Sequence, residues 1–120
     1  FRPFCPSMTF ESRANYLVKQ REEPFMITSF DAVESARPRI PAVVHADGTL
    51  RPQTVRRETN PRFWNLLNAY GGRTGDPILL NTSFNIKGEP MICHPREAIR
   101  CFFDSGMDAL GIGDLLITKT

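Results

Sequence analysis

The change from apolar to polar residues between Asp76 and Pro90 most constrains what this chain can fold into. The apolar run at residues 78–80 predicts a buried strand. Hydrogen-bonding side chains follow it at once, at Asn81, Thr82, Ser83 and Asn85. Proteins with mixed strands and helices place ligand sites in such loops, where a rigid strand holds polar side chains. We therefore expect a strand with a ligand-binding loop at its end, interrupted by Gly88 and Pro90.

The polar residues of this loop allow two interpretations. Their amides and hydroxyls can donate hydrogen bonds to phosphate oxygens or to a carbonyl group. Alternatively, they form a local turn in which Asn and Ser side chains satisfy their own backbone. A serine nucleophile is less favoured, because no Gly-x-Ser-x-Gly elbow is present and neither His45 nor His94 has an evident partner.

The rest of the pattern mixes helices and strands. Asn60 and Pro61 predict the start of a helix that ends at Gly71-Gly72, and Pro95 predicts the start of another. Further strands are predicted at residues 25–30, 42–45, 50–57, 91–93, 110–112 and 115–118. The turn signal Asp47-Gly48 predicts that residues 42–45 and residues 50–57 form a hairpin. The sum is an α+β (mixed α/β) fold, in one domain of 120 residues.

Arginine dominates the basic residues, with twelve of the fifteen, although the net charge is only +2. The planar guanidinium suits phosphate and carboxylate groups, and a stiff backbone holds it best. This favours Arg2, which lies beside Pro3, and Arg51, which follows the Asp47-Gly48 turn. The alternative is a rim of solvated charges, paired with acids such as Glu11, Glu58 or Asp47.

Several classes of site and location are disfavoured. The three cysteines have no Cys-x-x-Cys spacing, which is typical of reduced thiols in a cytoplasmic protein. Neither histidine has a second ligand at metal-binding spacing, so no metal site is predicted. No apolar run has the length of a membrane span, and no signal peptide is present. Lys87-Gly88 is a weak phosphate-binding signal, because the spaced glycines of a P-loop are missing.

Five ordered motifs resemble the C-terminal domain of the NodU/CmcH-type O-carbamoyltransferases. They are Phe1-Arg-Pro-Phe-Cys-Pro6, Pro41-Ala-Val-Val-His-Ala-Asp-Gly-Thr-Leu-Arg-Pro-Gln-Thr-Val55, Asn60-Pro-Arg-Phe-Trp64, Asn81-Thr-Ser-Phe-Asn-Ile-Lys-Gly-Glu-Pro90 and Met107-Asp-Ala-Leu-Gly-Ile-Gly113. The family usually has Ala at the position of Cys5. The resemblance runs almost from end to end of the chain.

The resemblance implies a two-domain enzyme. Its C-terminal domain is YrdC-like, with a twisted mixed sheet and flanking helices, and forms carbamoyl adenylate from carbamoyl phosphate and ATP with Mg²⁺. The partner is then an N-terminal ASKHA-type domain, which transfers the carbamoyl group to an acceptor hydroxyl. The acceptor is a sugar-containing natural product, such as a Nod factor or an antibiotic. Any metal of that partner domain is not encoded in these 120 residues. The residues implied for binding are Arg2, Arg51, Asn81, Thr82, Ser83 and Asn85, with catalytic roles for Arg51 and Ser83.

One departure from the family lowers the activity expected of this chain alone. The family carries a Lys-x-Arg-Glu run just before Phe-Arg-Pro-Phe, and this sequence begins after it. Each lost charge-assisted hydrogen bond removes about 1.5–3 kcal/mol. Two such losses weaken binding by a factor on the order of a hundred or more. We therefore expect weak binding by the isolated domain and slow or no turnover.

Two other functions are alternatives to this one. An RNA-binding YrdC-like module requires a basic stripe with stacking aromatic residues, whereas the arginines here are scattered among acids, which makes nucleic acid an unlikely partner. A non-catalytic docking domain, which only completes the site of its partner domain, is the other alternative.

Overall fold

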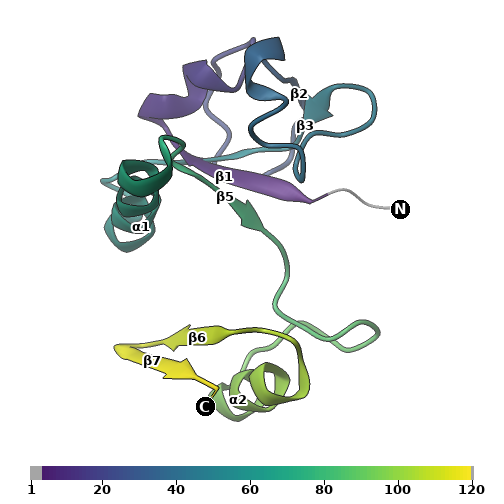
Figure 1. The fold of residues 1–120 in the computed structure, drawn as a ribbon, viewed down its shortest axis with the longest axis vertical. Coiled ribbons are helices and arrows are strands. Elements are labelled where there is room, and N and C mark those ends of the chain that lie inside the picture. Colours follow the sequence, from purple (N-terminus) through teal and green to yellow (C-terminus); the bar gives the residue numbers. More distant parts are fainter. Residues whose placement is uncertain (1–3, 120) are drawn as a thin grey trace. The chain divides into compact units, whose positions relative to one another are not determined.

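The computed structural model describes residues 4–119, which form two compact units divided between Thr82 and Ser83 (Figure 1). Each unit contains both helices and strands, so the predicted α+β class is confirmed. The expectation that residues 1–120 act as one domain stays a prediction, and the two units are described separately below.

The first unit is built on a three-stranded mixed sheet. Strand β1 (Cys5–Thr9) lies in the centre, with β4 (Gln53–Val55) parallel to it on one side and β5 (Ile78–Asn81) antiparallel on the other. All five residues of β1 are buried. The predicted strand at 78–80 is therefore confirmed, and it ends at Asn81 next to the start of β1.

A second, two-stranded sheet corrects two of the predictions. Strand β2 (Phe30–Asp31) pairs antiparallel with β3 (Thr49–Leu50). The Asp47-Gly48 turn is present. However, residues 42–45 before it form no strand, so the predicted hairpin is wrong. The buried Pro52 lacks an N–H group and divides the predicted strand 50–57 into β3 and β4, which have different partners.

The predicted strand at 25–30 is also wrong except at its last residue. The carboxylate of the buried Glu23 accepts a hydrogen bond from the N–H of Phe25 (3.3 Å). Such side-chain bonds to the backbone compete with strand pairing and hold a turn instead.

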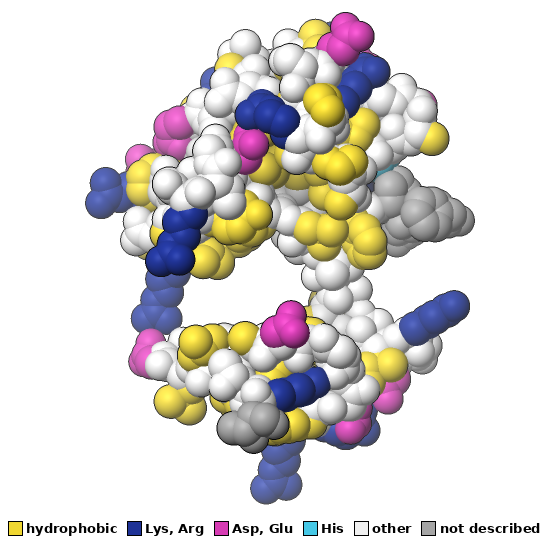
Figure 2. Space-filling view, viewed as in Figure 1, with side chains coloured by type: hydrophobic (Ala, Val, Ile, Leu, Met, Phe, Trp, Pro, Cys, Tyr) yellow, Lys and Arg dark blue, Asp and Glu magenta, His cyan; other side chains and the backbone are white. Residues whose placement is uncertain are grey.

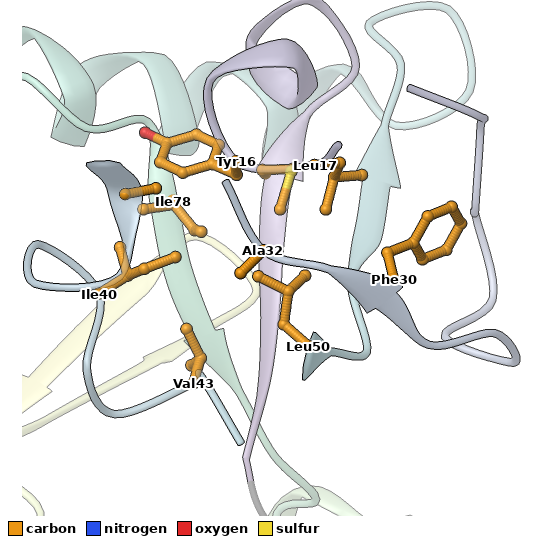
Figure 3. Close-up of a cluster of buried hydrophobic side chains, with 10 residues drawn as sticks. Tyr16, Leu17, Phe30, Ala32, Ile40, Val43, Leu50 and Ile78 are labelled. Atoms are coloured by element: carbon orange, nitrogen blue, oxygen red, sulfur yellow. The ribbon is translucent and has the colours of Figure 1, made fainter. Parts of the chain in front are cut away.

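Buried apolar side chains fill one side of the three-stranded sheet (Figure 3). Met8 and Ile78, which are partners across β1 and β5, pack there with residues of β2 and β3. The cluster also includes Ala36 of the 3-10 helix η2 (Glu34–Ala36) and the two residues that follow Asn15, the end of the 3-10 helix η1 (Glu11–Asn15). Tyr16 is fully buried and donates a hydrogen bond to Asp76 Oδ1 (2.7 Å). Burial, together with this bond, raises the pKa of Tyr16 above its usual range.

Helix α1 (Pro61–Thr74) begins as predicted. Asn60 is its N-cap and accepts a hydrogen bond from the N–H of Phe63, while Pro61 occupies the first turn. The predicted end at Gly71-Gly72 is wrong, because the helix continues to Thr74 and stops at Gly75 in the left-handed conformation. Of the residues of α1, only Leu67 is buried.

The second unit contains helix α2 (Pro95–Asp104) and the hairpin of β6 (Ala109–Ile112) and β7 (Leu115–Thr118). The predictions for these elements are confirmed. Residues 91–93 form no strand, because the N–H of Cys93 bonds to the Glu97 carboxylate instead. Phe102 is fully buried against Ala98 and Leu110, whereas its neighbour Phe103 is 57% exposed.

The start of α2 predicts a measurable pH dependence in the second unit. Hydrogen bonds from the backbone N–H groups of Cys93 and His94 hold the pKa of Glu97 below its ordinary value of 4.5. Because the folded pKa is lowered, the stabilisation is complete above pH 4.5 and is lost as the pH falls through the folded pKa.

We expect acid to speed amide hydrogen exchange in α2 of the wild type, after correction for the intrinsic pH dependence of exchange. Glu97→Gln keeps an acceptor but cannot titrate, so α2 of this variant should lose part of that acid sensitivity. An unchanged acid response in Glu97→Gln would contradict the assignment.

Candidate functional site

A row of polar side chains crosses the three-stranded sheet on the face opposite Met8 and Ile78. Cys5 and Ser7 alternate along β1 with the residues that face the core, and Asn81 pairs with Cys5 across the sheet. Gln53 of β4 pairs with Ser7. Arg51 precedes Gln53 by two residues, so the sequence pattern places both on the same side.

Hydrogen bonds fix the orientation of this row. Gln53 Nε2 donates to the carbonyl of Pro24 (3.2 Å), so its Oε1 faces the sheet. That oxygen accepts from Ser7 Oγ (2.8 Å) and from Asn81 Nδ2 (3.2 Å), and Asn81 Nδ2 also contacts Ser7 Oγ (2.9 Å). The network therefore assigns the amide nitrogen of Asn81 to the interior. Its oxygen has no hydrogen-bond donor among residues 4–119.

Arg51 is half-buried and contacts a thiol in place of a carboxylate. Its Nε and Nη2 donate to Cys5 Sγ at 3.2 and 3.0 Å. A thiol sulfur is a weak acceptor, so most of the charge of the guanidinium stays available for a stronger one. Asp47, the nearest acid in sequence, accepts instead from Thr49.

Other arginines form ion pairs with acidic side chains, which was the alternative interpretation of the arginine residues. The pairs in the described part of the chain include Arg39 with Asp76, Arg56 with Glu22 and Arg100 with Glu89. Arg51 has no such partner within residues 4–119. A half-buried guanidinium without a carboxylate is the arrangement expected of an anion clamp.

The structure brings only part of the predicted site together. In the first unit, Arg51 contacts Cys5 of β1, Asn81 of β5 pairs with Cys5, and Thr82 is exposed just after β5. Ser83 and Asn85 belong to the second unit, and Arg2 lies outside the described residues. The binding roles of these residues therefore stay predictions.

Ser83 and Asn85 form the local turn that was the alternative interpretation of the loop. Ser83 Oγ donates to Asn85 Oδ1 (2.6 Å), and Asn85 Nδ2 donates to the carbonyls of Ile86 and Glu89 (3.1 Å each). Lys87 and Gly88 are the central residues of a tight turn closed by the Glu89 N–H on the Ile86 carbonyl (3.0 Å), with Gly88 at φ 91°. The glycine therefore serves this turn.

Sequence reasoning missed three members of the polar row: Cys5, Ser7 and Gln53. The spacing of Arg51 and Gln53, two apart in an extended segment, could have indicated a shared face. Ser7 gave no such signal, because its role depends on which strands lie beside β1. Cys5 is buried, and its sulfur contacts Arg51.

Four further findings concern the thiols, a helix cap, metal ions and membranes. Cys5, Cys93 and Cys101 are all free thiols. His94 caps α2, where Nδ1 accepts from the Arg96 N–H. Among residues 4–119, no group of three or more His, Cys, Asp or Glu side chains is placed to hold a metal ion. No helix in that range is long and apolar enough to span a membrane.

Comparison with known proteins gives the family. The family model described as "Carbamoyltransferase C-terminus" matches residues 1–119. This chain belongs to that family. The predicted kinship with NodU/CmcH-type C-terminal domains is thereby confirmed, and the transferase class is supported at the level of the family.

Individual relatives agree with this membership. Nodulation protein NolNO of Sinorhizobium fredii is 43% identical over 122 residues, covering 99% of this chain and 18% of that protein. Nodulation protein NolO of Bradyrhizobium diazoefficiens is 39% identical over 122 residues, covering 99% and 22%. The 3'-hydroxymethylcephem-O-carbamoyltransferase of Amycolatopsis lactamdurans is 32% identical over 114 residues, covering 95% and 22%. The chain thus spans about a fifth of the length of these curated relatives.

Proposed function

We propose that this chain is the carbamoyl-adenylate-forming part of an O-carbamoyltransferase that uses carbamoyl phosphate and ATP. The observation that carries the proposal is the half-buried guanidinium of Arg51, which lacks a carboxylate partner within residues 4–119. Asn81 lies on the same face of the sheet, with its amide fixed by Ser7 and Gln53. Membership of the carbamoyltransferase family supports the choice of carbamoyl phosphate as the anion.

The proposed chemistry is mostly electrostatic. Carbamoyl phosphate and water give carbamate and inorganic phosphate. A carbamate oxygen then attacks the α-phosphorus of ATP, and pyrophosphate leaves with the electron pair of the broken P–O bond. Arg51 would stabilise the charge that builds on the phosphate oxygens, together with Mg²⁺ that arrives with ATP. Asn81 Oδ1 would accept a hydrogen bond from the carbamoyl NH₂ group.

The loop and the N-terminal segment complete this proposal. Arg2, Thr82, Ser83 and Asn85 are the further residues that we propose for substrate binding, with a catalytic role for Ser83. The adenylate would pass to an N-terminal ASKHA-type domain, since relatives about five times longer leave room for one. We infer a cytoplasmic enzyme, because ATP is abundant in that compartment and the three cysteines are free.

The acceptor in this proposal is a hydroxyl group of a sugar-containing natural product. Relatives named as nodulation proteins favour a Nod factor, and the cephem O-carbamoyltransferase shows that the family also includes an enzyme named for another natural product.

Exchange of labelled pyrophosphate into ATP tests the adenylation step. We expect the natural full-length polypeptide to catalyse exchange only when carbamoyl phosphate is present, and Arg51→Ala to reduce the rate. The proposal would be wrong if the exchange rate did not depend on carbamoyl phosphate. It would also be wrong if an enzyme that still carbamoylates its acceptor catalysed no exchange. A docking domain predicts that Arg51→Ala leaves exchange unchanged, and an RNA-binding module predicts salt-sensitive RNA binding with no exchange.

A further inference from the structure

The outer edge of β5 is an open strand edge. In the antiparallel pairing of β1 with β5, Pro6 lies opposite Leu80. Pro6 has no N–H group, so this pair belongs to the set that exchanges no backbone hydrogen bonds. The N–H and C=O of Leu80 therefore point away from β1, whereas those of its neighbour Leu79 point toward Ser7.

The hydrogen bonds around β5 agree with this register. The N–H of Ile78, two residues before Leu80, bonds to the carbonyl of Asp76 (2.8 Å) and thus also points away from β1. No bond from the outward N–H of Leu80 is formed within the described part of the chain. A strand with free outward groups is a template on which another strand can pair.

The opposite edge of the same sheet is covered by the chain itself. The outward N–H of Thr54 in β4 bonds to the carbonyl of Glu23 (2.8 Å), and the N–H of Glu23 bonds to Thr54 Oγ1 (2.8 Å). Gln53 adds a bond to the Pro24 carbonyl. The open edge at β5 is therefore a local property of this strand, since the β4 edge is satisfied.

A groove of about 350 Å³ lies along this edge. Three consecutive residues, 78–80, line it. Successive side chains of a strand point to opposite faces, so a groove that touches all three follows the strand edge. Residues 39–43 form one wall, and Tyr70 and Thr74 of α1 contribute to another. Figure 3 shows Ile40 on the side of β5 away from β1, and Val43 in front of β5.

The groove is lined by both apolar and charged side chains. Leu80 and Tyr70, which are 45% and 41% exposed, are among the apolar ones. Arg39 and Asp76, which form an ion pair (2.6 Å), are the charged ones. Hydrophobic side chains also gather on the visible face of this unit in Figure 2. A strand with apolar side chains fits such a surface.

We propose that β5 accepts an additional strand, donated by the part of the natural polypeptide outside these 120 residues. The curated relatives are about five times longer than this chain, so the polypeptide has ample length to supply it. Pairing would extend the sheet to four strands in the order β4-β1-β5-donor. The donor strand would lie next to Asn81, and its residues would border the polar row. This proposal does not depend on carbamoyl adenylation.

Amide hydrogen exchange at two adjacent residues tests the added strand. In the 120-residue chain we expect the Leu79 amide, which bonds to β1, to exchange slowly and the Leu80 amide to exchange fast. In the full-length polypeptide the Leu80 amide should exchange slower by on the order of tenfold or more, with Leu79 protected in both. Equal exchange of Leu80 in the two polypeptides would overturn the proposal.

Other occupants give different results in the same experiment. Protection of Leu80 in the 120-residue chain that rises with protein concentration would indicate a second copy of the chain. Protection there at all concentrations would show that the chain covers its own edge. Either result overturns a donor strand from elsewhere in the polypeptide.

Proline substitution supplies a matched pair of variants. Leu80→Pro removes an outward N–H, so the 120-residue chain should keep its fold, because proline is tolerated on a free strand edge. Leu79→Pro removes a bond to β1 and should destabilise the same chain. In the full-length polypeptide, Leu80→Pro should abolish slow exchange in the donor strand. Equal destabilisation of the 120-residue chain by the two variants would contradict the assigned edge.

Discussion

Replacing Arg51 with alanine is expected to weaken the binding of carbamoyl phosphate and ATP by about tenfold to more than a hundredfold, which corresponds to the loss of one charge-assisted contact of about 1.5–3 kcal/mol. Arg51 is half-buried, and within residues 4–119 it donates two hydrogen bonds to a weak acceptor, the Cys5 thiol. The free energy of unfolding should therefore change little, while binding measured by calorimetry on the full-length polypeptide falls.

Two control variants separate anion binding from a structural role for Arg51. Cys5→Ala removes the thiol contact and introduces the residue usual in the family, so binding should stay within about threefold of the wild type. Arg51→Lys keeps the charge but loses the planar fork, so binding should be intermediate. If Cys5→Ala weakens binding as much as Arg51→Ala, the contact between the two side chains matters and direct anion binding by Arg51 is wrong.

Gly71→Ala and Gly72→Ala should change stability in opposite directions. A methyl group at Gly71 would lie 2.7 Å from Pro77 Cβ and 2.9 Å from Pro77 Cα and N, so the turn between α1 and β5 would have to move. Overpacking of this kind costs about 1–3 kcal/mol or more. A methyl group at Gly72 meets no atom within 4 Å, and alanine in a helix is favoured by about 0.5–1 kcal/mol.

Urea unfolding of the two variants, followed by a signal from the first unit, measures these changes. The pair is matched because both glycines lie in the last turns of α1. A stability loss of similar size in both variants would mean that glycine is needed for the helix end itself, as the sequence pattern had predicted. A loss at Gly71 alone supports close packing against Pro77.

Local signals in the sequence predicted the elements that they control directly. Asn60 and Pro61 start α1 because a cap and a fixed φ angle act within one turn, and Pro95 does the same for α2. The apolar run 78–80 became β5. The predicted helix end at the glycines 71 and 72 was wrong, because Gly71 allows a close contact with Pro77, which lies beyond the helix.

Strand pairing depended on information that is not local. The Asp47-Gly48 turn forms, yet β3 pairs with β2, about twenty residues earlier, and not with the segment beside the turn. The candidate site shows the same limit. Arg51 and Asn81 were identified from residue type and motif, whereas Ser7 and Gln53 join them only because β1 lies between β4 and β5. Long-range strand order decides which polar residues meet.

Chemical-shift mapping of the 120-residue chain with ATP and Mg²⁺, and then with carbamoyl phosphate, tests the central claim most directly. Even at millimolar affinity, the account predicts shifts at the backbone and side-chain signals of Arg2, Arg51 and residues 81–85, and weaker shifts in Arg51→Ala. If these signals stay unchanged with ligand that saturates the full-length polypeptide, the titration is repeated after adding the upstream Lys-x-Arg residues. Unchanged signals there as well would contradict the proposed nucleotide and carbamoyl site.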